Sequence, residues 1–154
     1  MKNIIKLLFV VYIFLFPLKS FALIEVDITR GNLNPLPVAV SALSSSEKDK
    51  KILENKLDVK DLGLEISKIV ENNLRQSGLF NPLNKDAFLQ KPDIAHLKPR
   101  FEDWALIKAQ ALITGKVTYA DEKLRVEFRL WDVLAAKEIM ALAFTTVPSN
   151  WRRV

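Results

Sequence analysis

Residues 123–133 (KLRVEFRLWDV) alternate between apolar and polar side chains over most of their length. The apolar positions are Leu124, Val126, Phe128 and Leu130, and the charged positions between them are Arg125, Glu127 and Arg129. An alternation of period two places these two sets on opposite faces of a β-strand. The stretch therefore predicts a strand that buries one face against the interior of a sheet-containing protein.

Two further stretches flank this strand and predict an antiparallel meander. Residues 111–119 (ALITGKVTY) precede it across a turn at 120–122, and residues 138–147 (EIMALAFTTV) follow it. Gly115 lies inside the first of these strands, which indicates a bulge or close packing. Upstream, residues 35–43 (PLPVAVSAL) are apolar on both faces, as expected of a central strand that is covered on both sides.

A long helix is predicted from about residue 58. Its apolar residues recur at helical spacing and form one stripe: Leu62, Ile66, Ile69, Val70 and Leu74. Asp58 or Asp61 is expected to cap its start. Arg75 lies in its last turn, and Gly78 follows, where a left-handed residue commonly ends a helix. Residues 101–108 (FEDWALIK) predict a second, shorter helix.

Two segments are predicted to be loops. Residues 44–60 are polar, charged and free of glycine, which indicates a mobile surface loop. Residues 91–99 are bounded by prolines and contain His96, the only histidine of the chain. A single histidine in a loop is usually solvated, so we do not expect His96 to be catalytic or to bind a metal ion.

The element order, with an alternating strand at residues 23–29 placed first, is β–β–α–(β)–α–β–β–β. It predicts an α/β (α+β) fold with a mixed, mostly five-stranded sheet and helices packed on one face. Residues 148–150 predict the start of a further helix, but the sequence stops at Val154, within its first turn. Such a short helix is not stable alone. We therefore expect a bare apolar sheet face, marginal stability, and a chain that is a fragment or a prematurely ended reading frame.

The first 22 residues predict a secretory signal peptide. Two lysines precede the apolar run at residues 7–16 (LLFVVYIFLF), and Ser20 and Ala22 supply small residues before a cleavage site. The run is shorter than the roughly 20 apolar residues that span a membrane, so we expect no stable membrane insertion after cleavage. The predicted organisation is a signal peptide at 1–22, an N-terminal segment at 23–33 and an α/β domain at 34–154.

Composition excludes several classes of function. Residues 1–22 contain three lysines and no acidic residue, so without them the formal net charge falls from +5 to +2. The remaining basic residues are scattered among acidic ones, which argues against nucleic acid as a partner. The absence of cysteine excludes thiol catalysis and cysteine-bound metal centres. We find no phosphate-binding loop, paired-histidine motif or nucleophilic serine, and so expect no catalytic residue, cofactor or metal ion.

The strand at residues 23–29 (LIEVDIT) alternates strictly, with Ile24, Val26 and Ile28 on its apolar side. Residues 30–32 (RGN) supply a turn after it. A strand at a free terminus can be an ordinary edge strand of its own sheet, or it can add to the sheet of another protein. Both alternatives remain open on the residues alone.

Several stretches in order resemble the TolB family of Tol-Pal system proteins. These are 24–31 (IEVDITRG) with 37–40 (PVAV), 74–83 (LRQSGLFNPL), 101–104 (FEDW) leading to 111–117 (ALITGKV), 126–133 (VEFRLWDV) and 151–154 (WRRV). The resemblance covers nearly all of the chain after residue 22 except roughly residues 44–56. No single motif is decisive, but their common order behind a signal peptide is specific.

The resemblance implies a periplasmic, non-enzymatic interaction domain that supports outer-membrane integrity and outer-membrane constriction during cell division. TolB proteins carry this α/β domain before a six-bladed β-propeller, which is missing from this chain. In the family the mature N-terminal segment binds the C-terminal domain of TolA, and the propeller binds the lipoprotein Pal. Only the TolA site maps onto this chain, at Leu23, Ile24, Glu25, Val26, Asp27, Ile28, Thr29, Arg30, Gly31, Asn32 and Leu33.

The chain departs from the family at two turns. Lys108 replaces a glycine that usually ends the short helix, and residues 134–137 (LAAK) replace a hairpin turn that contains glycine. Because alanine disfavours positive φ, a longer or right-handed connection is expected there. Two other functions stay open: a non-functional remnant of a broken gene, and a small periplasmic enzyme or ligand-binding protein, which would need polar groups that converge in a pocket.

We predict that signal peptidase cleaves between Ala22 and Leu23, because Ser20 and Ala22 are the small residues on either side of Phe21. N-terminal sequencing of the exported protein is expected to begin at Leu23. Protein that begins at Met1 and stays in the membrane fraction would contradict the prediction.

Overall fold

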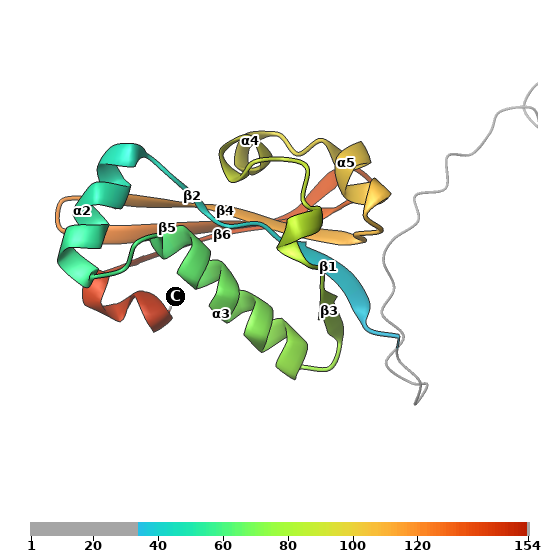
Figure 1. The fold of residues 1–154 in the computed structure, drawn as a ribbon, viewed down its shortest axis with the longest axis horizontal. Coiled ribbons are helices and arrows are strands. Elements are labelled where there is room, and N and C mark those ends of the chain that lie inside the picture. The colour runs from blue at the N-terminus through green and yellow to red at the C-terminus, as the bar shows by residue number, and fades with distance from the viewer. Residues whose placement is uncertain (1–33, 154) are drawn as a thin grey trace, which may run out of the picture.

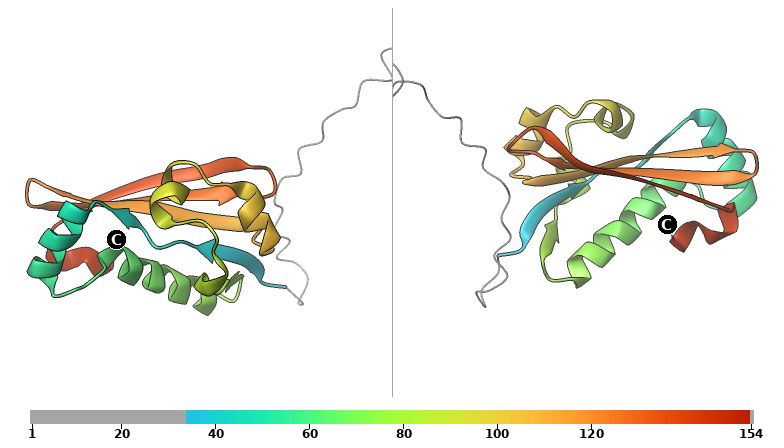
Figure 2. Two further views of the ribbon diagram at one scale, coloured as in Figure 1. Left: turned by 45° about the horizontal axis from the view of Figure 1, so that its top comes forward. Right: turned by 180° about the vertical axis from the view of Figure 1, so that it is seen from behind.

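A mixed β-sheet of six strands runs through the protein, and helices lie against both of its faces (Figures 1 and 2). The computed structural model of the protein describes residues 34–153, so the strand predicted at 23–29 lies outside the described residues. The strands are β1 (Leu36–Val40), β2 (Ser44–Ser45), β3 (Phe80–Pro82), β4 (Ala111–Ala120), β5 (Lys123–Asp132) and β6 (Lys137–Thr146). Their order across the sheet is β3-β1-β4-β5-β6, and β2 pairs with β4.

The predicted antiparallel meander is confirmed as β4, β5 and β6. Asp121 and Glu122 connect β4 to β5, with φ angles of 49° and 59°. Two consecutive left-handed residues are the mark of a two-residue hairpin whose twist matches that of the strands. Leu124 and Val126 are fully buried on the predicted inner face of β5.

The other half of the sheet is parallel, with β1 between β3 and β4. Val38, Ala39 and Val40 are each at most 1% exposed, so the prediction of a strand covered on both sides is confirmed. The strand is shorter than residues 35–43. Past Val40 the chain is held to β4 by the amide of Ser41, which donates to the carbonyl of Ile113 at 2.9 Å.

One face of the sheet is covered by α3 (Leu62–Gln76), the predicted long helix. Of the two candidate caps, Asp61 is the one used, because its carboxylate accepts from the amide of Leu64 at 2.9 Å. Ile66 is buried in the same cluster as Val117 of β4 and Val126 of β5. Gly78 follows with φ of 71°, as expected of the left-handed residue after a helix end.

The prediction of a loop at residues 44–60 is wrong, because this segment forms β2 and the helix α2 (Glu47–Leu57). The Ser46 hydroxyl caps α2 by accepting from the amide of Asp49 at 3.1 Å. Leu53 is 1% exposed and joins the same core cluster as Ile66. A serine cap with an acidic first turn, followed by the buried Leu53, was thus a helix signal that the surrounding charges obscured.

Short helices cover the opposite face, so the helices are not confined to one side. They are η1 (Lys85–Ala87), α4 (Pro92–Leu97) and α5 (Phe101–Leu106). α5 confirms the short predicted helix, whereas α4 replaces the loop predicted around His96. Trp104 is 1% exposed against Leu112 of β4, and its indole donates to Gln90 Oε1 at 3.0 Å.

The chain end forms η2 (Pro148–Arg153), which confirms a helical turn after residue 147 but makes it a 3₁₀ helix. Trp151 is 8% exposed and packs in the cluster that contains Leu53 and Ile66. None of the helices between residues 34 and 153 combines the length and the apolar composition that a membrane span requires.

The connection between β5 and β6 spans residues 133–136. The Asp132 carboxylate organises it by accepting from the amides of Leu134 and Ala135, each at 2.9 Å. The expectation of right-handed backbone is wrong at Ala136, which has φ of 51°. Lys108 likewise adopts positive φ, at 62°.

Replacing Ala136 with glycine is expected to raise the free energy of unfolding by about 1 kcal/mol, because the left-handed conformation costs alanine but not glycine. Urea denaturation measures the change. Ala135→Gly is the matched control, since Ala135 lacks positive φ and glycine there only adds chain entropy to the unfolded state. An equal gain from both variants would contradict the explanation.

Candidate interaction surface

The predicted partner-binding segment, residues 23–33, and the cleavage site at Ala22 and Leu23 lie outside the described residues. Only Asn34 and Pro35 separate this segment from the first residue of β1. β1 is buried on both faces at the centre of the parallel half of the sheet. A partner bound to residues 23–33 would therefore be joined directly to the best-buried strand of the domain.

An open groove with an apolar lining lies between α3 and β6, and we call it the α3–β6 groove. It has a volume of about 330 Å³ and is lined by Val70, Ile113, Phe128, Arg129, Leu130, Met140, Leu142 and Phe144. α3 contacts β1, β3 and β4 and leaves the β6 side of this face uncovered.

The side chains of β6 are exposed although they are apolar. Met140 is 45% exposed, Leu142 49% and Phe144 42%. They lie on the same sheet face as Phe128, whose ring meets that of Phe144 edge to face at 6.2 Å between centroids. The sequence predicted the strand and a bare apolar sheet face, but not that β6 would carry the exposed side chains. The run of apolar residues at 139–144 (IMALAF), on both faces of the last predicted strand, was the available signal.

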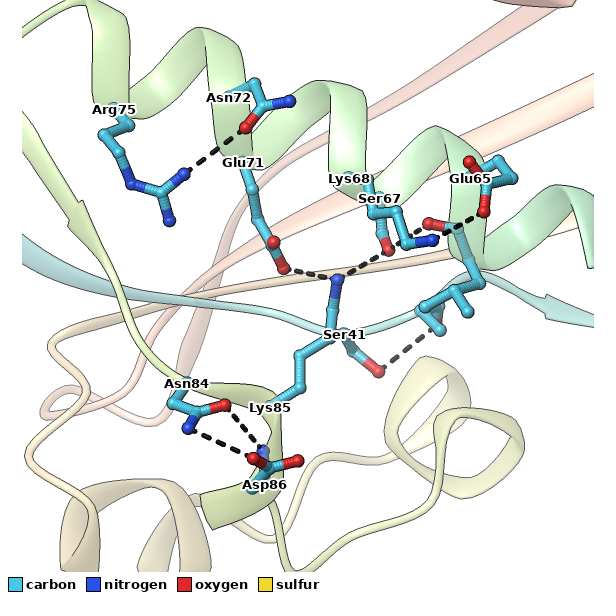
Figure 3. Close-up of polar contacts among 12 residues, drawn as sticks. Ser41, Glu65, Ser67, Lys68, Glu71, Asn72, Arg75, Asn84, Lys85 and Asp86 are labelled. Carbon is cyan, nitrogen blue, oxygen red and sulfur yellow. Dashed lines mark hydrogen bonds and ion pairs between the residues drawn. The ribbon is translucent and has the colours of Figure 1, made fainter.

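A polar cluster joins α3 to η1 (Figure 3). The Lys85 ammonium contacts the Glu71 carboxylate at 2.5 Å and donates to the Ser67 hydroxyl at 3.0 Å. Ser67 is fully buried, and its own hydroxyl donates to the carbonyl of Leu64 at 2.7 Å. The long Lys85 side chain thus ties η1 to α3.

This cluster has a structural rather than a catalytic role. A nucleophilic serine needs a base that accepts its proton. Ser67 instead donates to a backbone carbonyl and receives a hydrogen bond from an ammonium group. Among the residues that the structure describes, no group of three or more histidine, aspartate or glutamate side chains is placed to hold a metal ion.

His96 lies on α4 and is only 6% exposed, so the expectation of a solvated loop histidine is wrong. Burial lowers the pKa of His96, and the nearby Arg129 and Lys116 lower it further, while Glu127 opposes them. Nδ1 of His96 has no hydrogen-bond partner among the described protein groups. The imidazole is therefore a neutral, packed side chain at neutral pH rather than a proton donor.

Residues 24–139 match the family model described as the TolB amino-terminal domain. The chain belongs to the TolB family. It is 74% identical over 151 residues to the Tol-Pal system protein TolB of Pelagibacter ubique (strain HTCC1062), and this alignment covers 98% of the chain. The chain spans 34% of the length of that relative, which extends well beyond the amino-terminal domain.

Solved structures show the same TolB-type fold at low sequence identity. The crystal structure of TolB from Acinetobacter baumannii superposes with a TM-score of 0.57 at 16% identity, over 77% of this chain and 25% of that one. The LpoB C-terminal domain from Salmonella enterica gives a TM-score of 0.52 at 11% identity, over 76% of this chain and 86% of that one. These likenesses confirm the mixed α/β fold class.

The lowered pKa of His96 predicts that this TolB domain loses stability as the pH falls below about 6.5, the ordinary histidine value. Unfolding releases the imidazole, which then binds a proton that the folded state resists, so acid favours the unfolded state. Between pH 7.5 and 5.5 the loss attributable to His96 is at most about 1.4 kcal/mol. Urea denaturation at both pH values measures it.

His96→Gln provides the control for this pH dependence, because it removes the only histidine of the chain. The variant is expected to be nearly insensitive over the same pH range, since the carboxylates titrate at lower values. An unchanged pH dependence in the variant would rule out His96 as its source.

Proposed function

We propose that this chain is a periplasmic, non-enzymatic component of the Tol-Pal system that supports outer-membrane integrity and outer-membrane constriction during cell division. The observation that carries the proposal is its 74% identity, across almost its whole length, to a Tol-Pal system protein TolB. At that identity the two share one fold and most of their surface chemistry. The signal peptide predicted at residues 1–22 supports the periplasmic location.

The mode of action that we propose is strand addition to the C-terminal domain of TolA through residues 23–33. Its support is the family resemblance together with the alternating pattern of residues 23–29. An extended strand that joins another sheet gains backbone hydrogen bonds, and its alternate side chains provide specificity. Ile24, Val26 and Ile28 would face the partner's core.

Binding to Pal is not part of this proposal, because the family assigns it to the propeller and this chain spans 34% of its relative. A non-enzymatic role is supported by the chemistry of the described residues. Several buried polar side chains there, Ser44, Ser67, Gln90 and Thr114, are hydrogen-bonded within the protein. The α3–β6 groove is lined by apolar side chains apart from Arg129.

The position of the chain end also supports the family relationship. By resemblance, the helix that begins near residue 148 packs beside the first helix of the TolB domain. η2 lies next to the amino-terminal part of α3, on the same side of the sheet as the α3–β6 groove (Figures 1 and 2).

Deletion of residues 23–33 is expected to abolish binding to the TolA C-terminal domain while leaving the domain folded, because β1 begins only at Leu36. Val26→Pro is expected to weaken binding strongly, since proline removes a backbone donor and fixes φ. Val26→Ile is the matched control and should bind normally. Isothermal titration measures the affinity, and circular dichroism checks the fold.

Two outcomes would contradict the proposed site. Undiminished TolA binding after the deletion would place the site elsewhere on the domain. Unfolding of the deletion variant would show that residues 23–29 are an integral edge strand of this sheet, which is the alternative that the sequence left open.

A further inference from the structure

A second open groove lies at the end of the sheet where β1 begins. It has a volume of about 730 Å³ and is bounded by α4, α5 and the β5–β6 turn, and we call it the α5–turn groove. Its apolar lining includes Ile94, Phe101, Ala105 and Leu134. Ile94 is 56% exposed and Leu134 is 72% exposed. Large apolar side chains that stay exposed around one hollow indicate a site of contact with another protein.

Backbone hydrogen bonds connect the start of β1 to this groove. The amide of Gln110 donates to the carbonyl of Pro37, and the amide of Val133 donates to the carbonyl of Gln110, each at 3.0 Å. Val133 lines the groove and lies two strand spacings, or about 10 Å, from Pro37. Figure 1 shows the start of β1 and α5 at the same end of the molecule.

The link between residues 23–33 and β1 is short and restrained. It consists of Asn34 and Pro35. Proline fixes its own φ and confines the residue before it to extended conformations. The chain can extend at most about 11 Å between residue 33 and Leu36. Any protein bound to residues 23–33 is therefore held beside this end of the sheet.

The size of a folded partner brings it over the groove. A domain of about 100 residues is roughly 30 Å across, which exceeds the roughly 20 Å that can separate residue 33 from the groove. The α3 side of this end is mainly polar, because Arg75, Gln76 and Ser77 are exposed there at the end of α3. The α5 side therefore offers the larger apolar contact.

The walls of the α5–turn groove are held in place without a partner. The Asp132 carboxylate accepts from the amides of Leu134 and Ala135, each at 2.9 Å, which fixes the turn that carries Leu134. On the opposite wall the ring of Phe101 meets that of Trp131 edge to face at 5.9 Å between centroids. Because these walls are already ordered, a partner that fills the groove loses little conformational entropy there.

We propose that the C-terminal domain of TolA, once it is paired with residues 23–33, packs apolar side chains into the α5–turn groove. This inference rests on the proposed function, which assigns that domain to residues 23–33. The paired strand supplies backbone hydrogen bonds, and the groove adds the burial of Ile94 and Leu134. Since the strand already tethers the partner, the groove contact forms within the complex and raises the overall affinity.

Isothermal titration with the TolA C-terminal domain compares the exported chain with a peptide of residues 23–33. The chain is expected to bind at least about tenfold more tightly, because the peptide lacks the groove. Ile94→Ser and Leu134→Ser in the exported chain should each weaken binding about fivefold, toward the affinity of the peptide. Leu142→Ser is the matched control and should bind normally, since Leu142 is exposed on the opposite face of the sheet.

Circular dichroism confirms that each variant is folded before its affinity is compared. Equal affinity of the chain and the peptide overturns this inference and leaves the proposed function intact. Full affinity of both Ile94→Ser and Leu134→Ser, or an equal loss in Leu142→Ser, does the same. A peptide that does not bind at all refutes the proposed strand addition, and this inference falls with it.

Discussion

The close approach of three chain segments at Gly115 is the constraint on which the sheet depends. A β-carbon at this position would stand 2.2 Å from the carbonyl oxygen of Glu127 and 3.0 Å from Cγ of Leu43. Gly115 lies in the middle of β4, which pairs in parallel with β1 and β2 and in antiparallel with β5. The Ser44 hydroxyl donates to its carbonyl at 3.3 Å. Any side chain here would separate the two halves of the sheet.

Side chains become less buried from Gly115 toward β6. The strands near Gly115 form the core, whereas β6 leaves its side chains available for contact. β4 carries residues of all three core clusters on its two faces, whereas β6 contributes none to their buried sets. The free-energy cost of exposing Met140, Leu142 and Phe144 to water is not offset by contacts with other described residues. Apolar surface of this extent on one strand is characteristic of a site of contact with further protein.

The sequence predicted most of the sheet because alternation is a strong signal where one face is buried. It failed at α2 and α4 for different physical reasons. In α2 a dense run of charges hid the cap at Ser46 and the single buried anchor Leu53. In α4 the bounding prolines suggested a loop, although proline at the first helical position favours a helix. A bare apolar sheet face was expected, but the sequence did not place it on β6, since burial depends on what lies above a strand. The predicted segment 23–33 lies outside the described residues.

The parallel pairing of β1 has a consequence for the order of folding. β1 pairs with residues 80–82 and 111–113, so its contacts close long loops. Because closing a long loop costs chain entropy, we expect these contacts to form in the last steps of folding. The meander and α3 consist of local contacts and can form first. While the chain is being synthesised, β1 thus lacks its β4 partner until residue 113 has emerged. Late pairing of β1 therefore keeps the chain without a stable tertiary structure until most of the domain has been synthesised.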